Sequence, residues 1–258
     1  MKKIILILAA IASLCACCGQ TCPKSPKVIA HRGWWIHEGS AQNSLASLRL
    51  AMEAGFFGSE TDVQMTRDSQ IVVFHDSKIK GKKVYKMTYE EVLADTTLVN
   101  GEKVSTLDEY LDLYTSIDSP TKLICEIKKQ STPEWQTYVA NKVHSIVLAH
   151  GIPADRLEYI SFSSVICDAL KQIAPDYPVA YLEGDFSPKK AGKRGYDGID
   201  YHYDIFYLQK RWVEKSHALG LCVNTWTVDD PKCAKDMANL GVDYITTNYP
   251  DQITDWMK

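Results

Sequence analysis

The sequence predicts an α/β fold, namely a (β/α)₈ barrel of the TIM type with a short antiparallel hairpin arm after the second strand. Short β-rich runs alternate with helical stretches along the chain, which is typical of βα units on a parallel sheet. Once an N-terminal leader is set aside, residues 28–258 remain, a length that one such barrel commonly fills. We therefore expect a single barrel domain over residues 28–258.

Nine runs have the composition of strands. They are residues 27–33, 58–66, 71–76, 122–128, 157–163, 178–184, 198–203, 221–227 and 242–248. Only the four residues "RDSQ" separate the second run from the third, whereas a crossover between parallel strands needs about a dozen or more. The third run must therefore return antiparallel to the second, which leaves eight runs for the barrel. If Thr66 pairs with Ile71, Asp62 lies opposite His75.

Capping signals place helices between these runs. Asn43 and Ser44 precede an amphipathic stretch that Gly55 closes, as an N-cap and a left-handed C-terminus require. Other signals follow the same rules of helix capping. They are the capping-box pairs Thr88 with Glu91 and Thr106 with Glu109, the cap-proline pairs Thr132-Pro133 and Asp230-Pro231, and Gly241 at a helix end.

The N-terminus resembles a bacterial lipoprotein leader. Lys2 and Lys3 precede an apolar run over residues 4–12, which is shorter than the roughly 20 residues of a membrane-spanning helix. The following "LCAC" resembles a lipobox, which predicts a signal peptide over 1–17, lipidation of Cys17 and a tether over 18–27. Cys18 is the alternative anchor, and an ordinary secretory signal is the alternative leader. We therefore expect an exported lipoprotein, anchored to a bacterial membrane on its periplasmic or cell-surface face.

The net charge of the chain bears on the kind of partner that it binds. The chain has 29 basic and 32 acidic residues, so loss of Lys2 and Lys3 leaves 27 against 32, a net charge near −5. This balance argues against a nucleic-acid partner, and the oligomeric state is left open.

Four cysteines (Cys125, Cys167, Cys222 and Cys233) lie in the predicted barrel without CxxC spacing. We expect buried thiols there, with disulfides as the alternative.

Titratable side chains fall where the predicted strands end. They are His31 and Arg32, Glu60 and Asp62, His75 and Asp76, and Glu126 and Lys128. In a (β/α)₈ barrel the carboxyl ends of the strands surround the active site. Two histidines, three carboxylates and a lysine are therefore expected at one mouth. Taken alone, each histidine could be a structural residue of the core, and each charged residue could be an ordinary exposed charge. Their occurrence together at strand ends favours a functional site.

The expected cluster of Glu60, Asp62 and Glu126 predicts a metal ion. Three carboxylates that converge would repel one another and take up protons unless a cation lay between them. Ligands that are all oxygen favour one hard divalent ion, Mg²⁺ or Ca²⁺. The two histidines can act as base and acid, since imidazole titrates near neutral pH.

Together these motifs resemble the glycerophosphodiester phosphodiesterases. "HRG" at 31–33, "ETD" at 60–62, "HD" at 75–76 and "EIK" at 126–128 follow the order of that family's signature, and residues 223–251 are similar to its C-terminal segment. The resemblance implies a metal-dependent hydrolase of glycerophosphodiesters, which yields sn-glycerol 3-phosphate and an alcohol. The nucleophile, water or a glycerol hydroxyl, is left open.

The resemblance also implies roles for individual residues. His31 and His75 would be the acid/base pair, while Glu60, Asp62 and Glu126 would be the metal ligands. Arg32 and Lys128 would bind the phosphate, and Trp226 would line the substrate pocket, although packing alone is the alternative for this residue. Tyr201, His202 and Tyr203 are further candidates for substrate contact.

Three segments depart from the family pattern. Gln42 replaces a glutamate before the first helix, Asn248 replaces a common aspartate, and the stretch 77–88 after "HD" is rich in lysine. The lysines are expected in a solvated loop or, alternatively, around an anionic head group. Two other functions compete with the implied one: a phospholipase that acts on intact or lyso-phospholipids, and a silent lipoprotein that binds a phosphorylated ligand.

Overall fold

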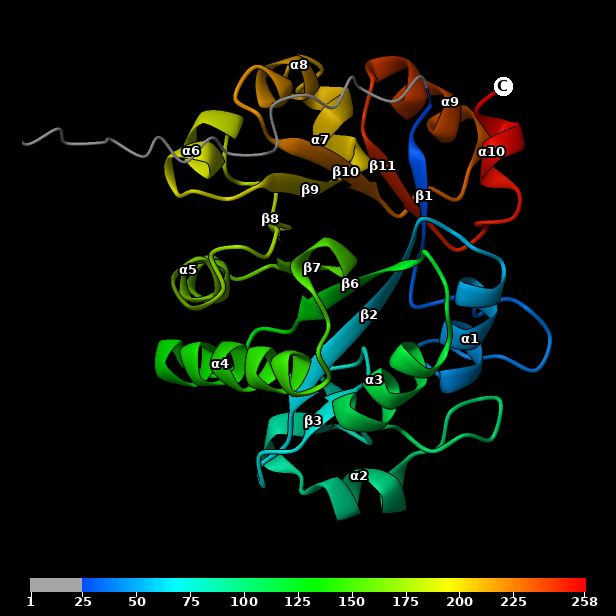
Figure 1. The fold of residues 1–258 in the computed structure, drawn as a ribbon, viewed down its shortest axis with the longest axis vertical. Helices are drawn as coiled ribbons and strands as arrows, with labels where there is room; N and C mark the ends of the chain where they lie inside the picture. Colours follow the sequence, from blue (N-terminus) through cyan, green and yellow to red (C-terminus); the bar gives the residue numbers. More distant parts are fainter. Residues whose placement is uncertain (1–24) are drawn as a thin grey trace, which may run out of the picture.

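The computed structural model describes residues 25–258 of the chain, shown in Figure 1. The predicted signal peptide 1–17, Cys17, Cys18 and most of the tether lie outside the described residues and stay predictions. Within residues 25–258, no helix combines the length and the apolar character needed to cross a membrane.

Eight parallel strands close into the predicted barrel. They are β1 (Lys27–Ala30), β2 (Gly58–Met65), β6 (Lys122–Ile127), β7 (Leu157–Ser161), β8 (Val179–Tyr181), β9 (Gly198–His202), β10 (Cys222–Trp226) and β11 (Tyr244–Thr247). Each strand pairs with its neighbour in the order β2, β6, β7, β8, β9, β10, β11, β1, and β1 pairs with β2 to close the ring. The fold class expected from the sequence is therefore confirmed.

The ninth strand, β3 (Ile71–Val73), runs antiparallel to β2 and forms the expected arm. Its predicted register was wrong by one residue. Met65 pairs with Ile71, so that Phe74 and not His75 lies opposite Asp62, and the backbone N–H of Phe74 donates to the Asp62 carbonyl at 2.9 Å. The cause is the turn: Thr66 N–H donates to the Gln70 carbonyl, and Ser69 adopts φ +63°. A three-residue loop that ends in a left-handed residue is a common hairpin connection.

Helices follow most strands and lie outside the ring (Figure 1). They are α1 (Leu45–Glu53), α2 (Tyr89–Asp95), α3 (Leu107–Ser116), α4 (Pro133–Ala149), α5 (Ser164–Ile173), α6 (Pro188–Lys193), α7 (Tyr203–Leu208), α8 (Trp212–His217), α9 (Pro231–Leu240) and α10 (Ile253–Trp256). A small second sheet pairs β4 (Lys78–Ile79) with β5 (Lys82–Lys83) in antiparallel fashion, and a 3₁₀ turn (Val84–Lys86) follows it.

The helices begin where the capping signals predict. Thr88 and Thr106 form complete capping boxes with Glu91 and Glu109 at the starts of α2 and α3. Thr132 and Asp230 cap α4 and α9, each before a proline in the first turn. At α1 the cap is Ser44 alone, which accepts from the Ser47 N–H. Asn43 is not part of this helix cap, because its side chain serves the candidate site described below.

Most of the apolar core lies between the strands and the surrounding helices. A smaller cluster lies inside the ring and includes Ile29, Ile124, Ile160 and Leu182, which close the barrel below its mouth. A third cluster, here called the arm cluster, packs β3 against the lysine-rich hairpin and α2. It contains Val72, Ile79, Val84, Met87, Val92 and Val104. Cys125, Cys167 and Cys233 are buried thiols, as expected, whereas Cys222 is only half-buried.

Gly33 allows the chain to turn out of β1 beside the site. It adopts φ +75°, and a Cβ atom there would lie 2.4 Å from Ser47 Oγ and 2.7 Å from the Ser47 carbonyl carbon. We expect Gly33→Ala to lower the free energy of unfolding by about 2–5 kcal/mol, since overpacking adds to the left-handed strain. Chemical denaturation measures this loss. Gly39→Ala is the control, because Gly39 has φ +78° but no atom within 4 Å of the added Cβ. Equal losses in both variants would show that packing against Ser47 contributes nothing.

Candidate active site

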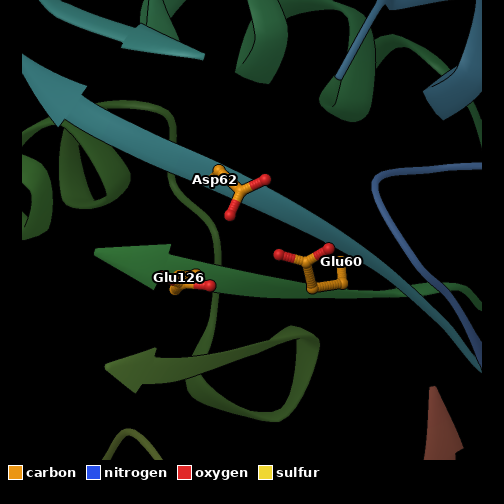
Figure 2. A group of neighbouring side chains, drawn as sticks. All are labelled: Glu60, Asp62 and Glu126. Carbon is orange, nitrogen blue, oxygen red and sulfur yellow. The ribbon is translucent and has the colours of Figure 1, made fainter. Parts of the chain in front are cut away.

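The predicted metal ligands converge on the neighbouring strands β2 and β6. Glu60 and Asp62 lie in the middle of β2, which continues into the arm, and Glu126 lies near the carboxyl end of β6. Figure 2 shows Glu60 and Asp62 on β2 and Glu126 on β6. Asp62 and Glu126 are direct register partners, and Glu60 lies two residues before Asp62 on the same face of its strand. One carboxylate oxygen from each of the three residues lies within 4.8 Å of those of the other two, and all three side chains are buried.

The three carboxylates repel one another, and their pKa values diverge. Burial, together with the charges of Asp62 and Glu126, raises the pKa of Glu60 well above its usual range. Burial and Asp62 raise the pKa of Glu126 to about 7. The pKa of Asp62 shifts in the opposite direction. Burial acts to raise it, but the charges of Lys128, His75 and Arg32 hold it well below the usual range.

Two cations lie against this cluster. Lys128 Nζ is 2.6 Å from Asp62 Oδ1 and 2.8 Å from Glu126 Oε1, and both carboxylates raise the pKa of Lys128 against the effect of burial. Arg32 Nε lies 3.5 Å from Asp62 Oδ2, while the Arg32 backbone N–H donates to Glu60 Oε2 at 2.8 Å. This backbone contact requires Arg32 to adopt φ +56°, a strained conformation of the kind that clusters at functional sites. Arg32 and Lys128 thus both form ion pairs with Asp62, and their expected role in binding phosphate stays a prediction.

The oxygen ligands suit a hard divalent ion. The cluster holds three carboxylates, two of them with raised pKa values, within the span of one ion. A cation that bound there would favour the ionised form of each carboxylate. The residues present therefore fit Mg²⁺ or Ca²⁺.

Asn43 and Gln42 form a second layer behind the charged residues. Asn43 Nδ2 donates to Asp62 Oδ2 at 2.8 Å, and its Oδ1 accepts from the Asp62 N–H and the Thr61 hydroxyl. Gln42 Oε1 accepts from Arg32 Nη1 at 2.5 Å. The sequence analysis assigned no role to Gln42. This hydrogen bond shows that its side chain orients Arg32. Asn43 was interpreted from sequence only as a helix start; its left-handed φ of +59° is what turns it toward Asp62.

His31 lies at the end of β1 and is held by a chain of hydrogen bonds that sequence reasoning missed. Its Nδ1 is 2.8 Å from Asn248 Oδ1, which also accepts from Trp35 Nε1 at 2.8 Å. Asn248 Nδ2 donates to Asp229 Oδ2 at 2.6 Å. Because the Asp229 carboxylate can only accept, the Asn248 amide oxygen must face His31, so that Nδ1 carries the proton and Nε2 is left as the basic nitrogen.

Burial and the neighbouring Arg32 charge lower the pKa of His31 to about 4 from its ordinary 6.5. In the unfolded chain this imidazole takes up a proton as the pH falls through 6.5, whereas in the folded chain it stays neutral until about pH 4. The unfolded state is therefore favoured as the pH falls through this window. We expect the wild type to lose up to about 3 kcal/mol of unfolding free energy relative to His31→Gln between pH 6.5 and 4. Urea denaturation in EDTA across this pH range measures the difference, and parallel curves for the two proteins would refute it.

His75 follows β3 at the end of the arm and lies at the same mouth. Its Nδ1 is 2.8 Å from Asp76 Oδ1. Burial lowers the pKa of His75, while Asp62 and Asp76 act to raise it. The two histidines thus have different partners, an amide for His31 and a carboxylate for His75. Both partners act to raise the pKa of the ring they contact, but only Asp76 carries a negative charge.

A cavity of about 100 Å³ lies beside the carboxylates. Seven of the predicted site residues line it, whereas Asp62 does not: they are His31, Arg32, Glu60, His75, Glu126, Lys128 and Trp226. Ile160, Phe162 and Leu182 give it an apolar side, and Phe162 packs edge-to-face on Trp226 with ring centroids 5.5 Å apart. Trp226 therefore lines this cavity, and its contact with substrate stays a prediction. Of the further candidates, Tyr201 does not line it: its side chain is fully buried, and its hydroxyl donates to the Phe186 carbonyl.

Asp200 on β9 is another residue that sequence reasoning missed. It lines the same cavity at 1% exposure, and its Oδ1 has no hydrogen-bond partner among the described residues. Its neighbour across the strands is Asn224 of β10. The alternation within residues 198–203 marks Asp200 as facing the same side as His202, but the sequence offers no signal that separates it from a structural aspartate.

Comparison with known proteins gives a consistent result. The model of the glycerophosphoryl diester phosphodiesterase family matches residues 31–252. A curated glycerophosphodiester phosphodiesterase from Caldanaerobacter subterraneus is 26% identical to this chain, with 90% of this chain and 97% of the relative covered.

Two solved structures are also similar. A glycerophosphodiester phosphodiesterase from Parabacteroides distasonis is 41% identical, with a TM-score of 0.87 and coverage of 90% of this chain and 97% of that one. A phosphodiesterase from Oleispira antarctica, solved in complex with the product sn-glycerol-3-phosphate, is 25% identical, with a TM-score of 0.75 and the same coverage.

Proposed function

Because the chain belongs to the glycerophosphoryl diester phosphodiesterase family and is a phosphoric diester hydrolase, we propose that it cleaves glycerophosphodiesters into sn-glycerol 3-phosphate and an alcohol, with one divalent metal ion and two histidines. The observation that carries the proposal is the convergence of Glu60, Asp62 and Glu126 with His31 and His75 at one mouth of the barrel. The product bound to the Oleispira antarctica relative supports the choice of substrate.

The partners of the two histidines suggest how they divide the work. His31, neutral and with its proton on Nδ1, offers Nε2 to take the proton of the attacking oxygen, which belongs to water or to a glycerol hydroxyl. His75, whose Nδ1 faces the Asp76 carboxylate, gives a proton to the oxygen of the departing alcohol. The roles thus follow from the amide beside one ring and the carboxylate beside the other.

Glu60, Asp62 and Glu126 would hold the metal ion, which would withdraw charge from the phosphate oxygens as a Lewis acid. Arg32 and Lys128, both in the cavity wall, add positive charge on either side of the carboxylates and would orient the phosphate. The apolar side formed by Phe162, Leu182 and Trp226 suits the carbon atoms of glycerol.

The experiment compares glycerophosphoethanolamine with its lysophospholipid counterpart at equal concentration, in Mg²⁺, Ca²⁺ or EDTA. We expect turnover of glycerophosphoethanolamine with at least one of the two metals, no turnover in EDTA, and a lower kcat/KM for the acylated substrate. Turnover in EDTA would refute metal dependence. A higher kcat/KM for the acylated substrate would instead indicate a phospholipase.

A further inference from the structure

A second and larger cleft opens beside the cavity. It measures about 580 Å³ and shares His75, Glu126, Lys128 and Phe162 with the cavity wall. His31 lines only the cavity, whereas His75 lines both. Since His75 is the group proposed to protonate the departing alcohol and is the histidine that borders the second cleft, this cleft is the side on which the alcohol would leave.

Three lysines line this second cleft without an acidic partner. Lys78 and Lys83 are paired across the β4–β5 hairpin, and Lys129 follows β6. Within residues 25–258 none of the three ammonium groups has a carboxylate at ion-pair distance, and none donates a side-chain hydrogen bond. The acidic residues of the lining are Glu126, which pairs with Lys128, and Asp76, which contacts His75.

The other two lysines of the same hairpin are neutralised. Lys80 Nζ lies 3.0 Å from Asp95 and Lys82 Nζ lies 2.8 Å from Glu91, both on α2. The hairpin thus presents one pair of lysines to acidic groups on α2 and the other pair to the cleft. A merely solvated loop would not require this division.

The hairpin is fixed in place below these lysines. Ile79 and Val84 are buried in the arm cluster together with Val92 of α2. A backbone hydrogen bond from the Val84 N–H to the Ser77 carbonyl closes the base of the hairpin. The backbone positions of Lys78 and Lys83 are therefore set before any ligand binds, which lowers the entropic cost of using them.

We propose that this lysine cleft, lined by Lys78, Lys83 and Lys129, binds the departing alcohol and selects glycerophosphodiesters whose alcohol carries its own anionic group, a phosphate monoester above all. The inference rests on the proposed function, since it takes the cleft as the site of the leaving group. The phosphodiester itself lies at the carboxylates and Arg32. The lysine cleft therefore supplies positive charge for a second anion.

The test uses two substrates that differ by one phosphate, glycerophosphoinositol and glycerophosphoinositol 4-phosphate. Glycerophosphocholine, whose alcohol is cationic, is the third. At low ionic strength we expect the wild type to have a kcat/KM at least about tenfold higher for the phosphorylated substrate than for glycerophosphoinositol. Added salt should reduce this ratio, because exposed charges are screened within about 10 Å at 0.1 M.

Two double variants of the hairpin, equal in charge, provide the comparison. Lys78→Gln/Lys83→Gln should bring the ratio close to one, whereas Lys80→Gln/Lys82→Gln should leave it as in the wild type. A wild-type preference for glycerophosphoinositol or glycerophosphocholine, or an equal effect of both double variants, would overturn the inference while the proposed function stands. If the wild type cleaves none of the three substrates, both are overturned.

Discussion

Replacing His31 or His75 with alanine is expected to lower kcat by about 10²- to 10⁴-fold, the range that one positioned acid or base contributes. Both rings line the cavity beside the carboxylates, and each is oriented through Nδ1, by Asn248 and by Asp76 respectively. The loss should lie in kcat more than in KM, because neither ring is assigned to hold the substrate. Steady-state kinetics with glycerophosphoethanolamine measures it.

The control is His37→Ala, since His37 is exposed and, within the described part of the chain, its ring contacts are to the adjacent Glu38 carbonyl and to Trp34. Near-ultraviolet circular dichroism should show that the variants keep the fold. If either catalytic variant retained more than about a tenth of the wild-type kcat, that histidine would not be an acid or base in the reaction.

Glu60→Gln is expected to abolish metal binding and activity together while leaving the fold unharmed. Glu60 accepts the Arg32 backbone N–H but has no side-chain ion pair among the described residues. Glutamine keeps that hydrogen bond and removes only the charge. We expect the affinity for the metal to fall by more than about a hundredfold. Mutation of a residue that only hydrogen-bonds to a metal ligand already lowers metal affinity by about 10- to 100-fold, and loss of a ligand should lower it further. Titration calorimetry with Mg²⁺ and Ca²⁺ measures the affinity.

Unlike Glu60→Gln, Asp62→Asn is expected to destabilise the fold. The carboxylate of Asp62 lies 2.6 Å from Lys128 Nζ and 3.5 Å from Arg32 Nε. Its loss leaves buried positive charge with fewer partners, which costs about 3–5 kcal/mol when a buried pair is broken. Glu90→Gln, on the exposed face of α2, is the control for both. Unchanged metal affinity in Glu60→Gln would exclude this carboxylate as a ligand.

Much of the fold could be predicted because its signals are local. The nine strands, the caps at Thr88, Thr106, Thr132 and Asp230, and the antiparallel arm all follow from spacings of a few residues. The arm register failed at the turn. Four residues separate Thr66 from Ile71 in sequence, but Thr66 pairs with Gln70 across a three-residue loop that ends at the left-handed Ser69, which shifts every pair by one.

The principal residues of the candidate site could also be predicted, since barrel topology gathers the strand ends whatever their separation in sequence. Their supporting partners could not. Asn248 approaches His31 across 217 positions, and Asn43 reaches Asp62 only because its backbone is left-handed. The unpartnered Asp200 carboxylate likewise depends on which side chains happen to surround it. Such contacts follow from packing in three dimensions and leave no periodic signal along the chain.

The most direct test of the proposed chemistry is a ³¹P NMR time course of glycerophosphoethanolamine with the purified enzyme. With Mg²⁺ or Ca²⁺ we predict that the phosphodiester resonance is replaced by that of sn-glycerol 3-phosphate, and that EDTA prevents the change. Formation of phosphoethanolamine would mean that the opposite ester bond is cleaved. An unchanged spectrum, with metal binding demonstrated by calorimetry, would contradict the assignment of this site to glycerophosphodiester hydrolysis.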